Sequence, residues 1–202
     1  YFQSALPPRI CDEIIKYGLE QQEQVALTGT QGNTDVKDLC EKDIKELHKK
    51  RKSNVVWMND RWIYNEIHPY IHMANKYAGW NFDWDFSESC QFTKYKLNQF
   101  YDWHCDSNEK PYDKPDESNS HGKIRKLSVT VSLADEKDYE GGEFEFDFRN
   151  KDDGSNIPHV CEEIKPKGSI VVFPSFVWHR VKPVTSGTRY SLVIWNLGWP
   201  YR

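Results

Sequence analysis

The chain has 202 residues and a formal net charge of −4 at pH 7. This length fits one domain with a sizeable core, and the acidic balance argues against a dedicated nucleic-acid binder. No apolar run approaches the length of a membrane-spanning helix, so we expect a cytoplasmic protein without a membrane partner. Five scattered cysteines without a CxxC pair indicate thiols in a reducing compartment, although one disulfide remains compatible with their spacing.

The N-terminal part of the chain has helical patterns. The first four residues, 1–4, resemble the remnant of a cleaved purification tag, and we expect residues 5–202 to form a single domain. Apolar residues recur at helical spacing after Cys11 and again from Asp60 to Tyr77, where Pro69 predicts a kink or a break. We therefore expect a helical part over about residues 5–80.

Residues 35–52 form a polar segment with some helical spacing, after a loop predicted at 28–33. The segment ends in a basic run at 49–52, which is compatible with a nucleic-acid patch. We interpret the run as the solvated end of a helix, where positive charge is favoured by the helix dipole.

From about residue 80 the hydrophobic period changes to two. Short segments between turn residues predict about eight strands, in a core over about 90–198: 92–97, 100–104, 127–133, 144–148, 159–164, 170–173, 177–181 and 190–197. Strands that follow a helical block predict an α+β fold, a barrel or jelly roll with the N-terminal helices packed against one sheet. The polar residues 108–123 predict a long loop, either a lid over a site or a disordered segment.

A His-x-Asp pair lies at the end of one predicted strand. His104 and Asp106 are two residues apart and can share a face, where an imidazole and a carboxylate suit iron, manganese or zinc. His179 supplies a second imidazole, and two histidines with one carboxylate form the facial triad of non-haem Fe(II) oxygenases. A hairpin after His179 would bring Arg189 alongside it, where the guanidinium could hold a carboxylate in bidentate fashion.

Together with Tyr95 and the turn Gly141-Gly142-x-Phe144, these motifs resemble the 2-oxoglutarate- and Fe(II)-dependent dioxygenases. The resemblance covers about Gln91 to Trp195, and is strongest to the prolyl 4-hydroxylase-like branch and its PKHD-type hydroxylases. It implies a double-stranded β-helix that uses Fe(II), 2-oxoglutarate and O2, with ascorbate as reductant. It also implies a peptide or protein partner and leaves the oligomeric state open.

The resemblance also implies roles for individual residues. His104, Asp106 and His179 would hold iron, and Arg189 would bind the distal carboxylate of 2-oxoglutarate. Further co-substrate contacts would come from Tyr95, Ser191, Phe144 and Val181, and substrate contacts from Trp195, Trp103 and Tyr101. Ser128 and Thr130 are compatible either with a pocket role or with ordinary strand polarity.

The implied reaction is hydroxylation of an unactivated C–H bond, best matched by a prolyl residue in a peptide, with release of succinate and CO2. A lysyl residue, a free amino acid or another small metabolite are alternatives. A nucleic-acid demethylase is disfavoured because Trp195 stands six residues after Arg189, where the demethylases usually carry a second arginine. A non-enzymatic jelly roll that only binds a metal is the alternative from another class.

Overall fold

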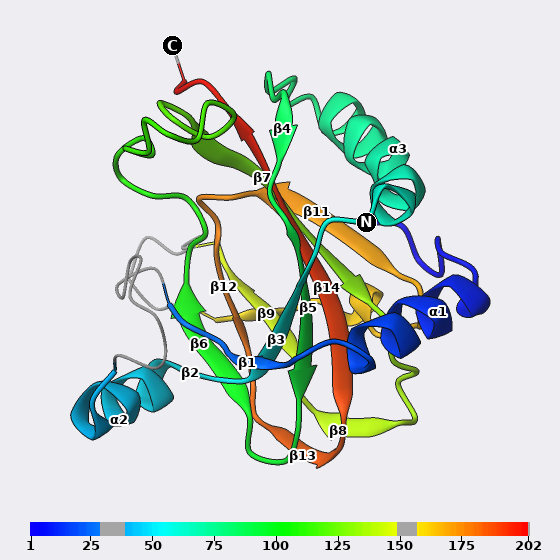
Figure 1. Ribbon diagram of the computed structural model, residues 1–202. Coiled ribbons are helices and arrows are strands. Elements are labelled where there is room, and N and C mark those ends of the chain that lie inside the picture. Colours follow the sequence, from blue (N-terminus) through cyan, green and yellow to red (C-terminus); the bar gives the residue numbers. More distant parts are fainter. Residues whose placement is uncertain (29–38, 149–156, 202) are drawn as a thin grey trace.

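The structure of the chain is a computed structural model, and it describes residues 1–28, 39–148 and 157–201. Two β-sheets face each other, and helices lie outside them (Figure 1). Within the described ranges the α-helices are α1 (Pro8–Leu19), α2 (Glu41–Lys50) and α3 (Arg61–Tyr77). None of them is long and apolar enough to cross a membrane.

The larger sheet has seven strands in the order β1-β3-β5-β14-β7-β11, and β4 pairs with β14 outside this path. Its strands are β1 (Gln24–Val25), β3 (Asn54–Met58), β4 (Phe86–Ser87), β5 (Cys90–Tyr95), β7 (Ile124–Ser132), β11 (Ile170–Pro174) and β14 (Arg189–Gly198). Every strand pair in it is antiparallel.

The smaller sheet has five strands in the order β10-β9-β12-β6-β2. Its strands are β2 (Arg51–Lys52), β6 (Phe100–His104), β9 (Phe144–Asp147), β10 (His159–Val160) and β12 (Trp178–Val181). A separate pair joins β8 (Tyr139–Gly141) to β13 (Val184–Gly187). Along the chain, β5, β6, β7, β9, β11, β12 and β14 alternate between the larger and the smaller sheet, so each sheet receives strands from distant parts of the sequence.

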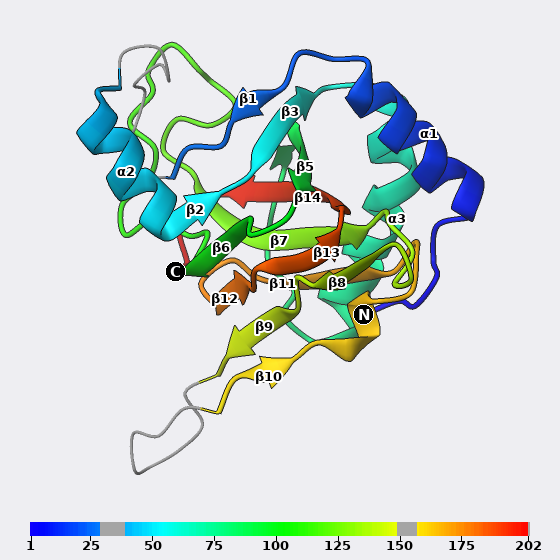
Figure 2. The ribbon, with the colours of Figure 1, turned by 90° about the horizontal axis from the view of Figure 1, so that it is seen from below.

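Helices α1 and α3 pack against the larger sheet. Their buried residues share one hydrophobic cluster with residues of β3, β5, β7, β11 and β14: Ile10, Cys11 and Ile14 from α1, and Ile63, Ile67 and Ile71 from α3. Both helices lie on one side of the sheets, and α2 lies on the opposite side (Figure 2). Helix α2 buries Leu47 and contacts β2 and β6 of the smaller sheet. The expectation that the helices cover one sheet therefore holds for α1 and α3 but not for α2.

The prediction of a wholly helical region over residues 5–80 is wrong, because β1, β2 and β3 lie inside it. Strand β3 pairs with β1 and β5 in the larger sheet, and it buries Val55, Val56 and Met58. A strand that buries successive residues lacks a clean two-residue period, so its pattern is hard to distinguish from a buried helix. The loop predicted at 28–33 and the first residues of the segment 35–52 lie almost entirely outside the described residues.

Two smaller expectations are also corrected. Helix α3 is continuous through Pro69, whose side chain is exposed, so the helix does not break there. Buried isoleucines on both sides of the proline attach this helix to the sheet. The strand predicted over 159–164 is only β10, followed by a 3-10 helix at Glu162–Ile164.

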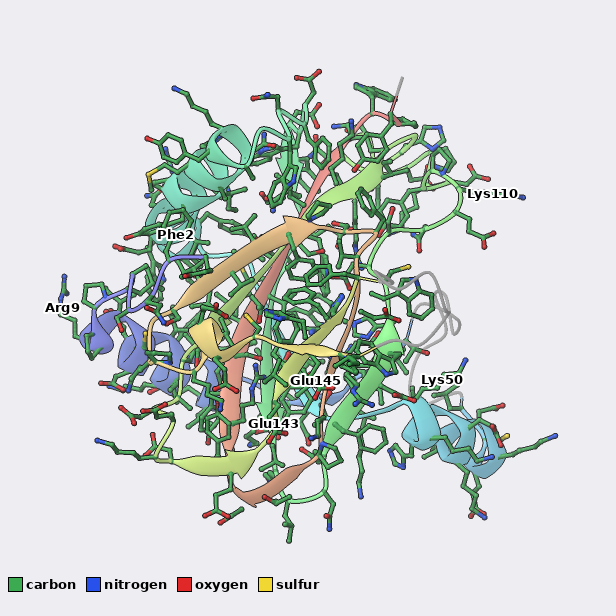
Figure 3. All side chains as sticks on the ribbon, turned by 180° about the vertical axis from the view of Figure 1, so that it is seen from behind. Phe2, Arg9, Lys50, Lys110, Glu143 and Glu145 are labelled. Atoms are coloured by element: carbon green, nitrogen blue, oxygen red, sulfur yellow. The ribbon has the colours of Figure 1, made fainter. Side chains whose placement is uncertain are left out.

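The N-terminal residues that we set aside as a tag remnant are folded onto the domain. Phe2 forms an antiparallel β-bridge with Ile170, and its ring packs edge-on against Tyr70 with the ring centroids 5.1 Å apart. Figure 3 labels Phe2 at the start of the chain. Three of the five cysteines, Cys11, Cys90 and Cys161, are buried thiols.

The long loop predicted between two strands connects β6 to β7. It is ordered by its own hydrogen bonds: the Tyr112 amide donates to the Lys123 carbonyl, and the Gly122 amide donates to the Tyr112 carbonyl, each at 2.9 Å. Lys123 also forms an ion pair with Asp85 at 2.7 Å. The predicted long loop between two strands is therefore confirmed, and its action as a lid stays a prediction.

Candidate metal centre and co-substrate pocket

The three predicted metal ligands meet where β6 ends beside β12. His104 is the last residue of β6, and the antiparallel register places His179 of β12 directly opposite it. Asp106 follows β6 by two residues, and the amides of Asp106 and Ser107 both donate to the Ser175 carbonyl at 2.9 Å. The sheet register thus positions the two histidines, and the turn before β12 holds the loop that carries the carboxylate.

The geometry of this triad suits a single metal ion. Nε2 of His104 lies 3.7 Å from Oδ1 of Asp106, and Nε2 of His179 lies 3.6 Å from Oδ2 of Asp106. One ligand atom from each of the three residues lies within 4.8 Å of the other two. Two ligands that are each about 2.1 Å from a metal can be at most about 4 Å apart, so these two distances are compatible with coordination. The predicted convergence of these residues is confirmed.

Both histidines present the same ring nitrogen to this point. Nδ1 of His104 lies 2.8 Å from the Asp102 carbonyl oxygen, and Nδ1 of His179 lies 2.9 Å from the Val177 carbonyl oxygen. A carbonyl can only accept, so each Nδ1 must carry the proton for these hydrogen bonds to form. The lone pair of each Nε2 is then available to a metal, and the carbonyls fix the ring orientations.

Asp106 is buried and kept ionised by its neighbours. Its Oδ2 accepts a hydrogen bond from the Ser128 hydroxyl at 2.7 Å, and Ser128 in turn lies 2.9 Å from the Ser175 hydroxyl. Burial alone would raise the pKa of Asp106, but His179, His104, Arg125 and the Ser128 hydrogen bond together hold that pKa below its usual value. A carboxylate that stays charged is the form that binds a metal.

His104 is kept neutral by its surroundings. Burial first, and then the neighbouring His179, lower the pKa of His104 to about 3, against the opposing effect of Asp106. The Tyr101 ring stacks on the His104 ring with the centroids 3.5 Å apart. The pairing of β6 with β12 shifts by one residue between Tyr101 and His104. This bulge brings Tyr101 to the same face as His104. A neutral imidazole needs no proton release before it binds a metal.

Arg189 enters the same cavity from the other sheet. It is the first residue of β14, paired with Tyr95 of β5, and only 2% of it is exposed. Its Nη1 donates to the Ser191 hydroxyl at 3.2 Å, and within the described residues no carboxylate lies within ion-pair distance of its guanidinium. The predicted hairpin between His179 and Arg189 is wrong, because β12 and β14 belong to different sheets and β13 pairs with β8 between them.

A small cavity joins the triad to Arg189. It is lined by most of the predicted contact residues: His104, Asp106, His179, Arg189, Tyr95, Ser191, Phe144, Val181, Thr130, Tyr101 and Trp195. The predicted substrate residue Trp103 does not line this cavity, because it is next to His104 in the strand and points to the other face. Its ring instead packs under the Arg180 guanidinium, 4.6 Å away.

A wider groove of about 280 Å³ adjoins this cavity and shares Gln91, Tyr101, Asp106 and Trp195 with it. The groove is also lined by Arg51, Trp57 and Arg125. Sequence analysis missed Arg51, because it placed that residue in a solvated basic run. The signal in the sequence was Ser53, two residues on and so on the same side of an extended strand, where its hydroxyl accepts from Nε of Arg51 at 3.0 Å.

Two facing β-sheets that enclose a His-Asp-His triad, with a buried unpaired arginine opposite, define the class of non-haem iron oxygenases. The family model described as "2OG-Fe(II) oxygenase superfamily" matches residues 90–196, and the chain belongs to that superfamily. It is similar to a PKHD-type hydroxylase of Synechococcus sp. (strain CC9902), with 36% identity over 108 residues, which are 53% of this chain and 40% of the relative. The match thus spans less than half of that relative's length.

Solved structures share the fold at low sequence identity. The viral collagen prolyl hydroxylase from Paramecium Bursaria Chlorella virus-1, solved as a 2OG complex, has a TM-score of 0.60 at 20% identity, over 97% of this chain and 93% of the viral one. A prolyl hydroxylase from Trichoplax adhaerens, in complex with a hypoxia inducible factor oxygen degradation domain peptide fragment, has a TM-score of 0.55 at 14% identity, over 94% and 89% of the two chains.

Proposed function

We propose that the chain is a 2-oxoglutarate- and Fe(II)-dependent dioxygenase that hydroxylates an unactivated C–H bond, with release of succinate and CO2. The observation that carries the proposal is the pairing of a metal-binding triad with a buried guanidinium that has no carboxylate partner in the described residues. We also propose that the two sheets form the double-stranded β-helix of this superfamily. The alternation of successive strands between the sheets supports that assignment.

His104, Asp106 and His179 would hold the iron on one face. Two neutral imidazole nitrogens and one carboxylate leave three coordination positions for the co-substrate and O2. When bound, iron and 2-oxoglutarate supply the oxidising chemistry that the side chains of the chain lack. The protein contributes the position of the three ligands, fixed by the Asp102 and Val177 carbonyls and by the Ser128 hydroxyl.

Arg189 would hold the distal carboxylate of 2-oxoglutarate. A buried guanidinium without a counter-charge is costly, and a carboxylate ligand would satisfy it through charge-assisted hydrogen bonds. Ser191 orients Nη1 of Arg189, and Tyr95 lies opposite in the sheet register. Phe144 and Val181 would form apolar walls that exclude water, since both are buried and line the cavity.

We propose a prolyl residue in a peptide or protein as the substrate. The support is the similarity to structures of prolyl hydroxylases, one of them solved with a peptide fragment. A lysyl residue, a free amino acid or a small metabolite fits the same chemistry. Ascorbate as a reductant stays an expectation from the resemblance.

The test is a succinate-release assay with Fe(II), 2-oxoglutarate and a panel of proline-containing peptides, followed by mass spectrometry for one added oxygen. We expect His179→Ala to abolish turnover and to weaken metal binding while the protein stays folded. His159→Ala is the matched control, because His159 is an exposed histidine of the same sheet outside the triad. Turnover that survives in His179→Ala would mean that the triad is misassigned. Bound iron without turnover of any substrate would instead favour a metal-binding protein.

A further inference from the structure

Two buried arginines border the cavities around the triad, and only one of them has an assigned ligand. Arg189 and Arg51 are 2% and 4% exposed, and within the described residues neither has a carboxylate at ion-pair distance. The less buried Arg125 and Arg180 are paired, with Glu88 and Glu145 respectively. Arg189 is explained by 2-oxoglutarate, so the charge of Arg51 remains to be explained.

Arg51 keeps one nitrogen without a hydrogen-bond partner after its structural contacts. Nε donates to the Ser53 hydroxyl at 3.0 Å, and Nη1 donates to the Leu27 carbonyl at 3.1 Å. Nη2 is buried and has no hydrogen-bond partner in the structure. A buried unsatisfied donor is costly, more so on a charged group, which points to an acceptor that binds there.

Among the described residues, only one other buried side-chain nitrogen or oxygen lacks a hydrogen-bond partner, and it is Nε1 of Trp195. Both residues line the groove of about 280 Å³ that adjoins the triad. Two residues that line the groove thus each carry a buried donor without a partner, and among the described lining residues Asp106 is the one carboxylate. The uncompensated charge in this groove is that of Arg51, since Glu88 neutralises Arg125.

The sheet register connects Arg51 to the metal site. Arg51 of β2 lies opposite Tyr101 of β6, and its guanidinium carbon is 4.4 Å from the centre of the Tyr101 ring. The other side of that ring stacks on His104. A ligand held by Arg51 would therefore lie one aromatic ring away from His104.

We infer that the substrate carries a carboxylate that accepts a hydrogen bond from Nη2 of Arg51, with Nε1 of Trp195 as a second donor to the substrate. The inference rests on the proposed function and specifies its substrate class. The carboxylate comes from an acidic residue beside the hydroxylated residue in a peptide, or from a small free acid. The N–H groups of Nη2 are free in the structure, and a guanidinium matches the planar geometry of a carboxylate.

The experiment compares acidic probes with neutral counterparts of the same shape. The peptide arm uses end-blocked four-residue peptides in which Glu precedes or follows the proline, each beside its Gln counterpart. The small-molecule arm uses N-acetylproline beside N-acetylprolinamide. Binding is followed by tryptophan fluorescence in protein loaded with Zn(II) and 2-oxoglutarate, because Trp57 and Trp195 line the groove. Turnover is followed by succinate release with Fe(II).

In the wild type we expect one arm to show at least about a 10-fold preference for the acid, the scale of a hydrogen bond to a charged group. Arg51→Gln is expected to reduce that preference to within about twofold. Lys52→Gln is the matched control, since it removes the same charge from the exposed neighbouring residue, and it should retain the preference. Arg51→Lys keeps the positive charge and should retain part of the preference for the acidic probe.

Equal binding of acid and neutral probes by the wild type would overturn the inference, and that comparison needs no variant. A preference that persists in Arg51→Gln would overturn it as well. The arm that shows the preference identifies the source of the carboxylate. Absence of succinate with every probe would count against the proposed function, whereas the Zn(II) binding arm would still decide the role of Arg51.

Discussion

Ser128→Ala tests whether the metal site depends on the residue behind its carboxylate. The hydroxyl of Ser128 donates to Oδ2 of Asp106 at 2.7 Å, and both Ser128 and its neighbour Ser175 are fully buried. A hydrogen bond to a charged group contributes about 1.5–3 kcal/mol. Loss of such a partner behind a metal ligand typically weakens metal affinity by about 10- to 100-fold, which agrees with that energy.

The assay is anaerobic equilibrium dialysis of Fe(II), with thermal unfolding to verify that each variant folds. Ser132→Ala is the control, because Ser132 is a buried serine of the same strand whose hydroxyl donates to the Ala134 carbonyl at 3.3 Å, away from Asp106. We expect its metal affinity to stay within about twofold of the wild type, since it loses a neutral hydrogen bond outside the site.

The deficit of Ser128→Ala should also grow in acid. The Ser128 hydrogen bond is one of the causes that lower the pKa of Asp106, so its removal raises that pKa. Protons then compete with the metal at a higher pH than in the wild type. A folded Ser128→Ala protein with wild-type metal affinity would refute this reasoning. Equal losses in Ser128→Ala and Ser132→Ala would attribute the effect to strand packing instead.

Three further predictions concern other parts of the site and its frame. Arg189→Lys should raise the KM for 2-oxoglutarate by about 10-fold or more because the bidentate fork is lost, with Fe(II) affinity from dialysis nearly unchanged. In metal-free protein the pKa of His104 is about 3, so below about pH 6.5 the unfolded chain binds a proton at this residue that the folded chain does not bind. The free energy of unfolding should therefore fall as the pH drops below about 6.5. The loss by pH 5, measured by urea unfolding, should be up to about 2 kcal/mol, and a His104→Gln protein should show a flatter profile. Gly141→Ala should destabilise the protein by more than the roughly 1 kcal/mol expected for Gly79→Ala in the same unfolding assay. Both glycines have φ near +70°, but a Cβ at Gly141 would lie 2.4 Å from the Pro183 carbonyl oxygen, whereas Gly79 has nothing within 4 Å. An unchanged KM for 2-oxoglutarate in Arg189→Lys would contradict the first argument. Equal pH profiles of the wild type and His104→Gln, or equal destabilisation by Gly141→Ala and Gly79→Ala, would contradict the other two.

The convergence of His104, Asp106 and His179 could be predicted from the sequence because their geometry is local. His104 and Asp106 lie two residues apart at a strand end, and His179 is the second residue of a strand that follows an apolar run, so alternation alone gives their orientation. The route of the chain between His179 and Arg189 could not be predicted. A short turn leads equally well into a hairpin or across to a facing sheet, and the side-chain period is the same in both cases.

Residues whose roles depend on distant partners were harder to assign. Ser128 was left between a pocket role and strand polarity, and its bond to Asp106 spans 22 positions in the chain. Arg51 follows two lysines at the end of a helix, and its burial results from pairing with β6, about 50 residues further on. The basic run alone suggests that Arg51 is solvated, whereas the pairing of β2 with β6 buries it.

The distribution of the site over two sheets has a consequence for how the protein can diverge. The metal ligands belong to β6, β12 and the loop between β6 and β7, whereas Arg189 and Tyr95 belong to β14 and β5 of the facing sheet. On the proposed roles, substitutions at Arg189 and Tyr95 would therefore change which oxo acid is accepted while the three metal ligands stay intact. On the inferred role of Arg51, substitutions on β2, at the edge of the smaller sheet, would change the substrate while Arg189 and the three metal ligands stay intact. If these roles hold, co-substrate and substrate selectivity would be open to independent engineering on one scaffold.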